Sequence, residues 1–153
     1  MSRTQPSSPH PRPRTLSVVV VNERREIARL ARLFDEFREG CGISDDDGAH
    51  IHLILDEVVS NVIKYGYDDG LEHRINVDVA VDGDHVTIRI EDDGKPFNPL
   101  DAPHPKLDLP IEQRPIGGLG VFIVKSVADS VDYRRHGGRN VVTVRKKIAR
   151  GIV

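Results

Sequence analysis

The spacing of hydrophobic residues changes along this chain, and the changes mark out its secondary structure. Alternating or β-branched stretches predict five strands, over residues 15–22, 73–83, 85–94, 130–136 and 139–148. Apolar residues that recur every three or four positions predict three helices, over residues 23–40, about 49–65 and 120–129. The predicted order is therefore β-α-α-β-β-loop-α-β-β.

Because the strands come as hairpins, we expect an α+β fold, a two-layer α/β sandwich. Its sheet would be mixed and mostly antiparallel, with the helices on one face. Local signals suggest the element ends: Asn22 to cap the first helix, Gly40 and Gly66 to end the first two, and Asp82-Gly83 to turn the central hairpin.

Proline placement divides the chain into a tail, a domain and an internal loop. Four of the ten prolines lie within residues 6–13, and the other six lie between residues 96 and 115. We expect residues 1–14, rich in Pro, Ser and Arg, to be a disordered tail and residues 15–153 to form one domain. A long loop inside a compact domain is usually functional or mobile.

Composition and charge exclude some classes of protein. The chain has 153 residues, of which 38% are hydrophobic and 30% charged, with a net charge of −2, so the whole chain has no strong attraction to nucleic acid or membrane. The single cysteine, Cys41, excludes an internal disulfide and fits a reducing compartment. No apolar run is long enough to span a bilayer, and we expect a cytoplasmic protein.

Three stretches could carry chemistry. In "LDEVVSNVIKYGY", Glu57, Ser60, Asn61 and Lys64 share one face of the helix at residues 49–65, opposite its apolar face. Asn is costly inside a helix, its side-chain oxygen suits Mg²⁺, and a carboxylate one turn away can accept a proton. The alternative for this stretch is a solvated surface.

The second stretch is "EDDGKPF", directly after the predicted strand at residues 85–94. Asp92 could accept a hydrogen bond from the exocyclic amine of adenine, and Gly94 would let the backbone approach a flat ring. The alternative here is an ordinary turn.

The third stretch, "RPIGGLGVFIVKSVAD", places Gly117, Gly118 and Gly120 at the start of an apolar helix. Amides at a helix start bind phosphate when no side chains intervene. The stretch matches neither a Walker loop nor a dinucleotide fingerprint, and loop flexibility is the alternative.

The three stretches in this order resemble the N box and the two glycine boxes of the GHKL (histidine-kinase-like) ATPase superfamily. The resemblance covers residues 15 to about 148 and is closest to stand-alone serine-protein kinases that act as anti-sigma factors, of the RsbW type. It implies a Bergerat-type ATP-binding fold with an ATP lid at about residues 95–116, and ATP and Mg²⁺ as cofactors.

The resemblance also implies roles for single residues. Glu57 would be the catalytic base that receives the proton of the acceptor serine, or would orient a water, and Asn61 would hold Mg²⁺ against the ATP phosphates. Asp92 would hydrogen-bond adenine, with Gly94 beneath the ring. The helix amides would be brought to the phosphates by Gly117, Gly118 and Gly120. Lys64 and Arg114 are candidates to neutralise phosphate charge, with ordinary surface as the alternative.

One family contact is not matched cleanly. Many relatives place a Thr near the start of the last strand, where it reaches adenine, and this chain has Asn140 and Val141 there. The seven histidines show no ligand spacing, so we expect no metal bound by histidine.

The function implied is an ATP-dependent protein serine/threonine kinase and anti-sigma factor in a partner-switching pathway. It would phosphorylate a small anti-sigma-factor antagonist and bind a sigma factor or another target protein. The family pattern is compatible with a homodimer. We expect no direct contact with nucleic acid or membrane. The alternative is a nucleotide-gated module that sequesters its partner with negligible kinase activity. A third reading, nucleic-acid binding through the Arg-containing tail, predicts binding that is lost when residues 1–14 are deleted.

Overall fold

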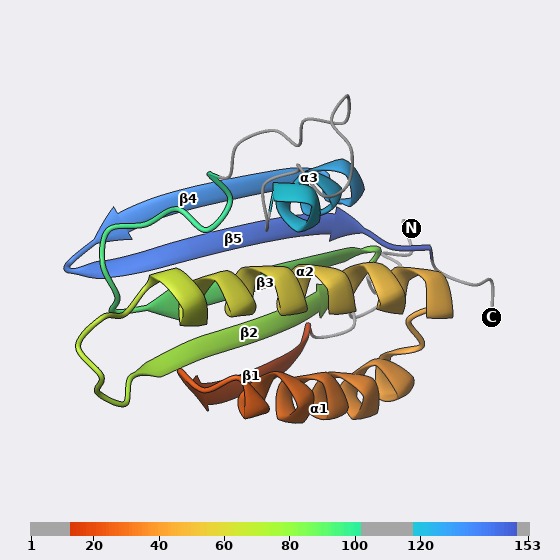
Figure 1. Ribbon diagram of the computed structural model, residues 1–153. Coiled ribbons are helices and arrows are strands. Elements are labelled where there is room, and N and C mark those ends of the chain that lie inside the picture. The colour runs from red at the N-terminus through yellow and green to blue at the C-terminus, as the bar shows by residue number, and fades with distance from the viewer. Residues whose placement is uncertain (1–12, 102–117, 150–153) are drawn as a thin grey trace, which may run out of the picture.

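The computed structural model describes residues 13–101 and 118–149 (Figure 1). The described part contains the predicted elements in the predicted order: β1 (Arg14–Val21), α1 (Arg25–Cys41), α2 (Asp45–Tyr65), β2 (Arg74–Asp82), β3 (His85–Asp92), α3 (Gly118–Val127), β4 (Ser130–His136) and β5 (Arg139–Lys147). Most of the expected tail and lid lie outside the described residues, and so do Arg114 and Gly117.

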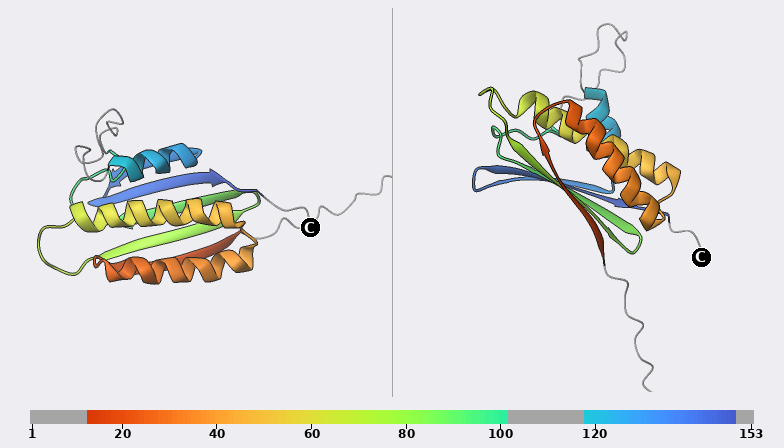
Figure 2. Two further views of the ribbon diagram at one scale, coloured as in Figure 1. Left: turned by 45° about the vertical axis from the view of Figure 1, so that its right-hand side comes forward. Right: turned by 90° about the horizontal axis from the view of Figure 1, so that it is seen from below.

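The five strands form one sheet in the order β1-β2-β3-β5-β4. The sheet was expected to be mostly antiparallel, and its four described pairings are all antiparallel. Viewed from below, all three helices lie on one face of the sheet (Figure 2). The α+β two-layer sandwich is therefore confirmed.

The core lies between the sheet and the helices, because each strand turns its alternate residues toward the helical layer. Strand residues on this inner face include Val20, Ile75, Val79, Ile88, Ile90 and Val144, each at most 1% exposed. Helix α1 contributes Leu30 and Phe34, and α2 contributes Ile51, Ile54, Leu55, Val58 and Val62. Each such side chain stabilises the fold by about 1.5–3 kcal/mol.

None of the described helices is both long and apolar enough to cross a bilayer.

The ends of α1 differ from the prediction. Asn22 does not cap the helix: its Oδ1 accepts from the His73 backbone N–H (2.8 Å), and its Nδ2 donates to the Leu71 carbonyl (3.1 Å). These bonds tie the end of β1 to the loop before β2. At the other end, Gly42 rather than Gly40 stops the helix, with the left-handed φ of 67° that glycine adopts at little cost.

Helix α2 begins at Asp45, one turn earlier than predicted. The hydroxyl of Ser44 caps it by accepting the Asp47 backbone N–H at 3.1 Å. Three aspartates in the first turn complement the positive end of the helix dipole, which explains why a polar "SDDDG" run is helical. The helix ends before Gly66, as predicted.

Candidate functional site

Helix α2 brings Glu57 and Asn61 to its polar face, one turn apart. Asn61 is buried, at 6% exposure, and its Nδ2 donates to the Pro99 carbonyl at 3.1 Å. Because a carbonyl oxygen can only accept, this bond fixes which end of the amide faces Pro99. The Asn61 Oδ1 has no hydrogen-bond partner among the described residues, so a neutral oxygen ligand is left over.

Glu57 is half-buried in the middle of the same helix. Burial raises the pKa of its carboxyl, the charge of the neighbouring Asp56 raises it further, and Lys64 opposes the shift. A carboxylate with a raised pKa is a better proton acceptor near neutral pH than an ordinary glutamate. Lys64 itself is exposed in the last turn of α2.

The first turn of α3 lies directly against Glu57. A Cβ atom added to Gly120 would overlap the Glu57 carboxylate, so this position has no room for a side chain while Glu57 keeps its place. Gly118 is the first residue of α3. Gly118 and Gly120, two of the three predicted glycines, therefore lie in the first turn of α3, close to Glu57, the predicted catalytic base.

Asp92 is the last residue of β3 and is 2% exposed. Its Oδ1 accepts from the Gly94 backbone N–H (2.8 Å) and from the Asn140 Nδ2 (3.0 Å). Burial raises the pKa of Asp92, and these two hydrogen bonds oppose that effect. The Asp92 Oδ2 has no hydrogen-bond partner among the described residues and remains an acceptor for a ligand.

Gly94 is packed closely against the carboxyl end of α2. A Cβ atom at Gly94 would stand 2.6 Å from the Gly66 carbonyl oxygen, which also accepts the Lys95 backbone N–H at 2.8 Å. Glycine is required here because of this backbone contact, a reason different from the one that the sequence suggested.

The first residues of the predicted lid belong to the packed domain. Leu100 is 3% exposed, and the Phe97 ring contacts Tyr65 of α2 with ring centroids 5.6 Å apart. Through Pro99, this segment also holds Asn61. The structure thus places three separate segments along α2: α3 at Glu57, the lid start at Asn61, and the turn after β3 at Gly66.

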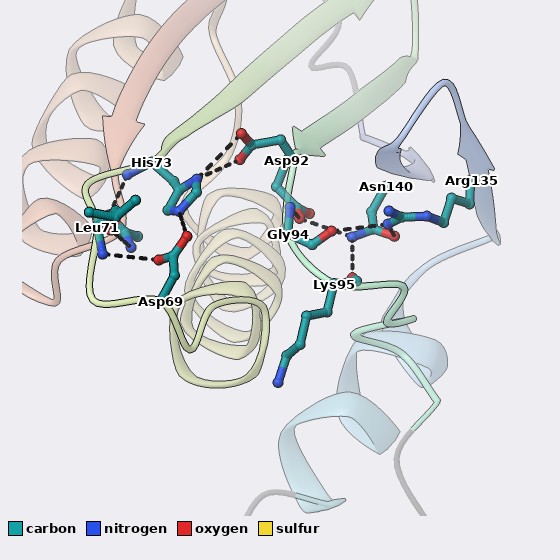
Figure 3. A network of polar contacts seen from close by, with 10 residues as sticks. Asp69, Leu71, His73, Asp92, Gly94, Lys95, Arg135 and Asn140 are labelled. Carbon is teal, nitrogen blue, oxygen red and sulfur yellow. Dashed lines mark hydrogen bonds and ion pairs between the residues drawn. The ribbon is translucent and has the colours of Figure 1, made fainter.

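Two groups of residues around the site were missed or left uncertain by sequence reasoning. One is Asn140 with Arg135, which lie beside the turn after β3 (Figure 3), together with Tyr133, whose hydroxyl donates to the Asn140 Oδ1. The other is His73, whose ring contacts Asp69 at 2.7 Å and Asp93 at 3.1 Å. The sequence signal for the Asn140 group was that many relatives have a Thr where this chain has Asn140. No sequence signal marked the His73 group.

Tyr67 lies beside this second group, stacked on the His73 ring with centroids 4.3 Å apart. Its hydroxyl is buried and makes no hydrogen bond that meets the usual geometry with any of the described residues. Burial and the nearby Asp92 and Asp93 raise the pKa of Tyr67, so the hydroxyl remains a proton donor. The Tyr67 hydroxyl is therefore an unused donor near Asp92, the carboxylate that is predicted to bind adenine.

Comparisons with known proteins identify the family of this chain. The family model described as "Histidine kinase-like ATPase domain" matches residues 20–146. A protein named serine-protein kinase RsbW, from Oceanobacillus iheyensis, is 25% identical over 63% of this chain and 64% of its own length, slightly less than two thirds of that relative. The anti-sigma F factor of the same organism is 25% identical over 77% of this chain and 80% of its own length.

A solved structure supports the fold. The crystal structure of the RsbU and RsbW domains of Rv1364c from Mycobacterium tuberculosis aligns with a TM-score of 0.66 at 16% identity, over 90% of this chain and 33% of that one. The family model spans well over half of the chain. The chain therefore belongs to the histidine kinase-like ATPase domain family, the GHKL superfamily that its motifs resemble, and within it is similar to RsbW-type proteins.

Proposed function

We propose that this chain is an ATP-dependent protein serine/threonine kinase that also acts as an anti-sigma factor in a partner-switching pathway. Its substrate would be a small anti-sigma-factor antagonist. The observation that carries the proposal is the contact between the Glu57 carboxylate and Gly120, because it puts a proton acceptor at the start of a glycine-rich helix. The names of the two relatives, a serine-protein kinase and an anti-sigma factor, support the same reading.

The residues present fit ATP and Mg²⁺. No group of three or more His, Cys, Asp or Glu side chains that could hold a metal occurs among the described residues. Mg²⁺ usually takes one or two protein ligands and completes its shell with phosphate oxygens and water. The free Oδ1 of Asn61 would be such a ligand, and the Asp92 Oδ2 would accept the adenine amine.

Each residue has a defined part in phosphoryl transfer. The amides at the start of α3 would face the phosphates, where helix N-termini favour anions. Bound Mg²⁺ would neutralise charge on the phosphate oxygens. Glu57 would accept the hydroxyl proton of the acceptor serine as its oxygen bonds to the transferred phosphorus and ADP leaves. Lys64, and Arg114 outside the described residues, stay candidates for charge neutralisation.

The second candidate function is a nucleotide-gated binding module without significant kinase activity. The hydrogen bond from Asn61 to Pro99 favours it, because a ligand at Asn61 would act on the start of the lid directly. A change in lid conformation could then alter partner binding without phosphoryl transfer.

A two-step experiment separates these functions. The chain is used to capture proteins with and without ATP·Mg²⁺, and phosphosites on the captured proteins are mapped. Labelled ATP is then supplied with the captured antagonist and either wild type or Glu57→Gln. We expect Glu57→Gln to lower the labelling rate by about 10²- to 10⁴-fold, the usual contribution of a general base.

ADP affinity should stay within about twofold in Glu57→Gln, since the isosteric amide removes the base and little volume. Glu36→Gln, an exposed position of α1, is the matched control and should change neither quantity. If Glu57→Gln labels the captured antagonist at the wild-type rate, Glu57 is not the catalytic base. A wild-type protein that binds ATP and never labels a captured antagonist would establish the gated module instead.

A further inference from the structure

Asn140 lies at the start of β5 and is 1% exposed, beside the turn that follows β3. Its Nδ2 donates to the Asp92 Oδ1 (3.0 Å) and to the Lys95 carbonyl (2.8 Å). Its Oδ1 accepts from the Tyr133 hydroxyl (2.6 Å) and from the Arg135 Nη1 (2.9 Å). One amide thus connects β3, β4, β5 and the first residues of the lid segment (Figure 3).

An asparagine amide has two donor hydrogens and two acceptor lone pairs. All four are used inside the protein at Asn140, so its side chain has nothing left to offer a nucleotide. Any effect of Asn140 on a bound base therefore has to pass through the groups that it holds, of which Asp92 is the charged one.

The contact with Asn140 decides which oxygen of Asp92 is available. Asp92 Oδ1 already accepts two hydrogen bonds, from Gly94 and Asn140, and Oδ2 accepts none among the described residues. Two fixed donors on one oxygen set the rotation of the carboxylate. The free oxygen is then presented in one direction before any ligand arrives.

The backbone of the same turn is held from two sides. Arg135 Nη1 donates to the Gly94 carbonyl at 3.0 Å, from the β4–β5 hairpin. On the other side, the Gly66 carbonyl accepts the Lys95 backbone N–H. Arg135 lies opposite Asn140 in the strand register, so the hairpin brings the two side chains to the turn together.

We propose that Asn140 is a positioning residue that makes the site select 6-aminopurine nucleotides, by holding Asp92 with only Oδ2 free for the amino group. This inference rests on the proposed nucleotide-binding function. A guanine base carries a carbonyl at the same ring position, and two acceptors face to face repel each other. A buried acceptor with a fixed direction discriminates strongly, because the wrong base leaves it unpaired.

The pH dependence of binding reports on the same contact. Burial raises the pKa of Asp92 and the Asn140 hydrogen bond lowers it; Gly94, Asp93, Arg135 and Tyr67 are the other groups that interact with it. The ionised carboxylate of Asp92 accepts more strongly from an amine than the protonated form, whose proton would sit on the otherwise available Oδ2. Loss of Asn140 should therefore move the acidic decline of ADP affinity to higher pH.

The test is calorimetric titration of the full chain with ADP and with GDP, both with Mg²⁺. In Asn140→Ala we expect ADP affinity to fall by about tenfold or more, the effect of one hydrogen bond to a charged group, and GDP affinity to change little. The ADP-to-GDP preference should fall accordingly. Thr143→Ala, on the same strand and the opposite face of the sheet, is the matched control and should keep the preference.

Tyr133→Phe removes only one bond to Asn140 and keeps the inference testable if Asn140→Ala does not fold. It should lower the ADP-to-GDP preference in the same direction by a smaller factor. If folded Asn140→Ala or Tyr133→Phe binds ADP with the preference and pH profile of wild type, the inference is overturned and the proposed function stands. If wild type binds neither nucleotide, both are overturned.

Discussion

At the scale of single residues, the contact between Gly120 and Glu57 couples the stability of α3 to the chemistry of the site. Gly120→Ala would place a methyl group where the Glu57 carboxylate lies. A carboxylate at the end of a flexible side chain can move aside, and alanine has a higher helix propensity than glycine. We therefore expect Gly120→Ala to unfold at no lower temperature and to transfer phosphate at least about tenfold more slowly.

Thermal unfolding and labelling of the captured antagonist measure the two effects on one sample. Lys125→Ala, at an exposed position of the same helix, is the control. A folded Gly120→Ala variant with wild-type activity would show that the position of Glu57 is not important for transfer.

Asn61 makes a second prediction at this scale, on magnesium. Its Oδ1 is the proposed protein ligand, so Asn61→Ala should lower ATP affinity with Mg²⁺ by about tenfold or more. Chelation of Mg²⁺ should weaken ATP binding to wild type and add little to the loss in Asn61→Ala. Ser60→Ala, its half-buried neighbour, should keep the full response to chelator. An equal response to chelator in all three proteins would exclude Asn61 as a ligand.

The residues that could be predicted are those on one regular element. Helical spacing predicts that Glu57 and Asn61 share one face of α2, and the structure places them one turn apart on that helix. Their roles in the site come from the family resemblance and stay predictions. Asn140 could not be assigned a role, because its bond to Asp92 joins residues 48 positions apart in the chain. Spacing within one helix or strand carries no information about such a contact.

At the scale of elements, helix ends were the least predictable feature, since each depends on a competition between neighbouring polar side chains. Asn22 has a good capping side chain, yet it bonds to the loop before β2 instead. Ser44 does cap α2, the helix that holds Glu57 and Asn61. Ser44→Ala should lower the free energy of unfolding by about 1 kcal/mol, measured by urea denaturation.

Glu36→Ala, in the exposed middle of α1, is the control for Ser44→Ala and should change stability by less than about 0.5 kcal/mol. An equal effect of the two substitutions would mean that the cap does not stabilise α2 in solution.

The loop between α2 and β2 is joined to the turn after β3 by His73. The hydrogen bond with Asp69, followed by that with Asp93, raises the pKa of His73 above its ordinary value. A raised pKa in the folded state means that protonation favours folding. The stabilisation is therefore fully present below the ordinary histidine pKa of about 6.5 and is lost as pH rises through the raised value.

This linkage predicts a pH-dependent effect of His73→Gln. Its loss of unfolding free energy relative to wild type should be larger at about pH 6 than at about pH 9. His136→Gln, in the exposed last position of β4, is the matched control. A difference between wild type and His73→Gln that is the same at both pH values would contradict the stabilising role of protonated His73.

At the scale of the whole molecule, the two-layer fold could be predicted because period-two and period-3.6 patterns are cleanly separated along the chain. The position of β5 between β3 and β4 could not be predicted, since alternation shows which residues face the core and not which strand pairs with which. That pairing sets Asn140 of β5 opposite Asp92 of β3.

Above all, we propose that segments distant in sequence meet along α2 to bind a single adenine nucleotide with magnesium. Isothermal titration of the full, folded chain with ATP and ADP in the presence of Mg²⁺ tests it most directly. A saturable heat of association with one nucleotide per chain is the predicted result. A folded protein that releases or absorbs no heat with either nucleotide would contradict the claim, and with it the kinase and the gated module.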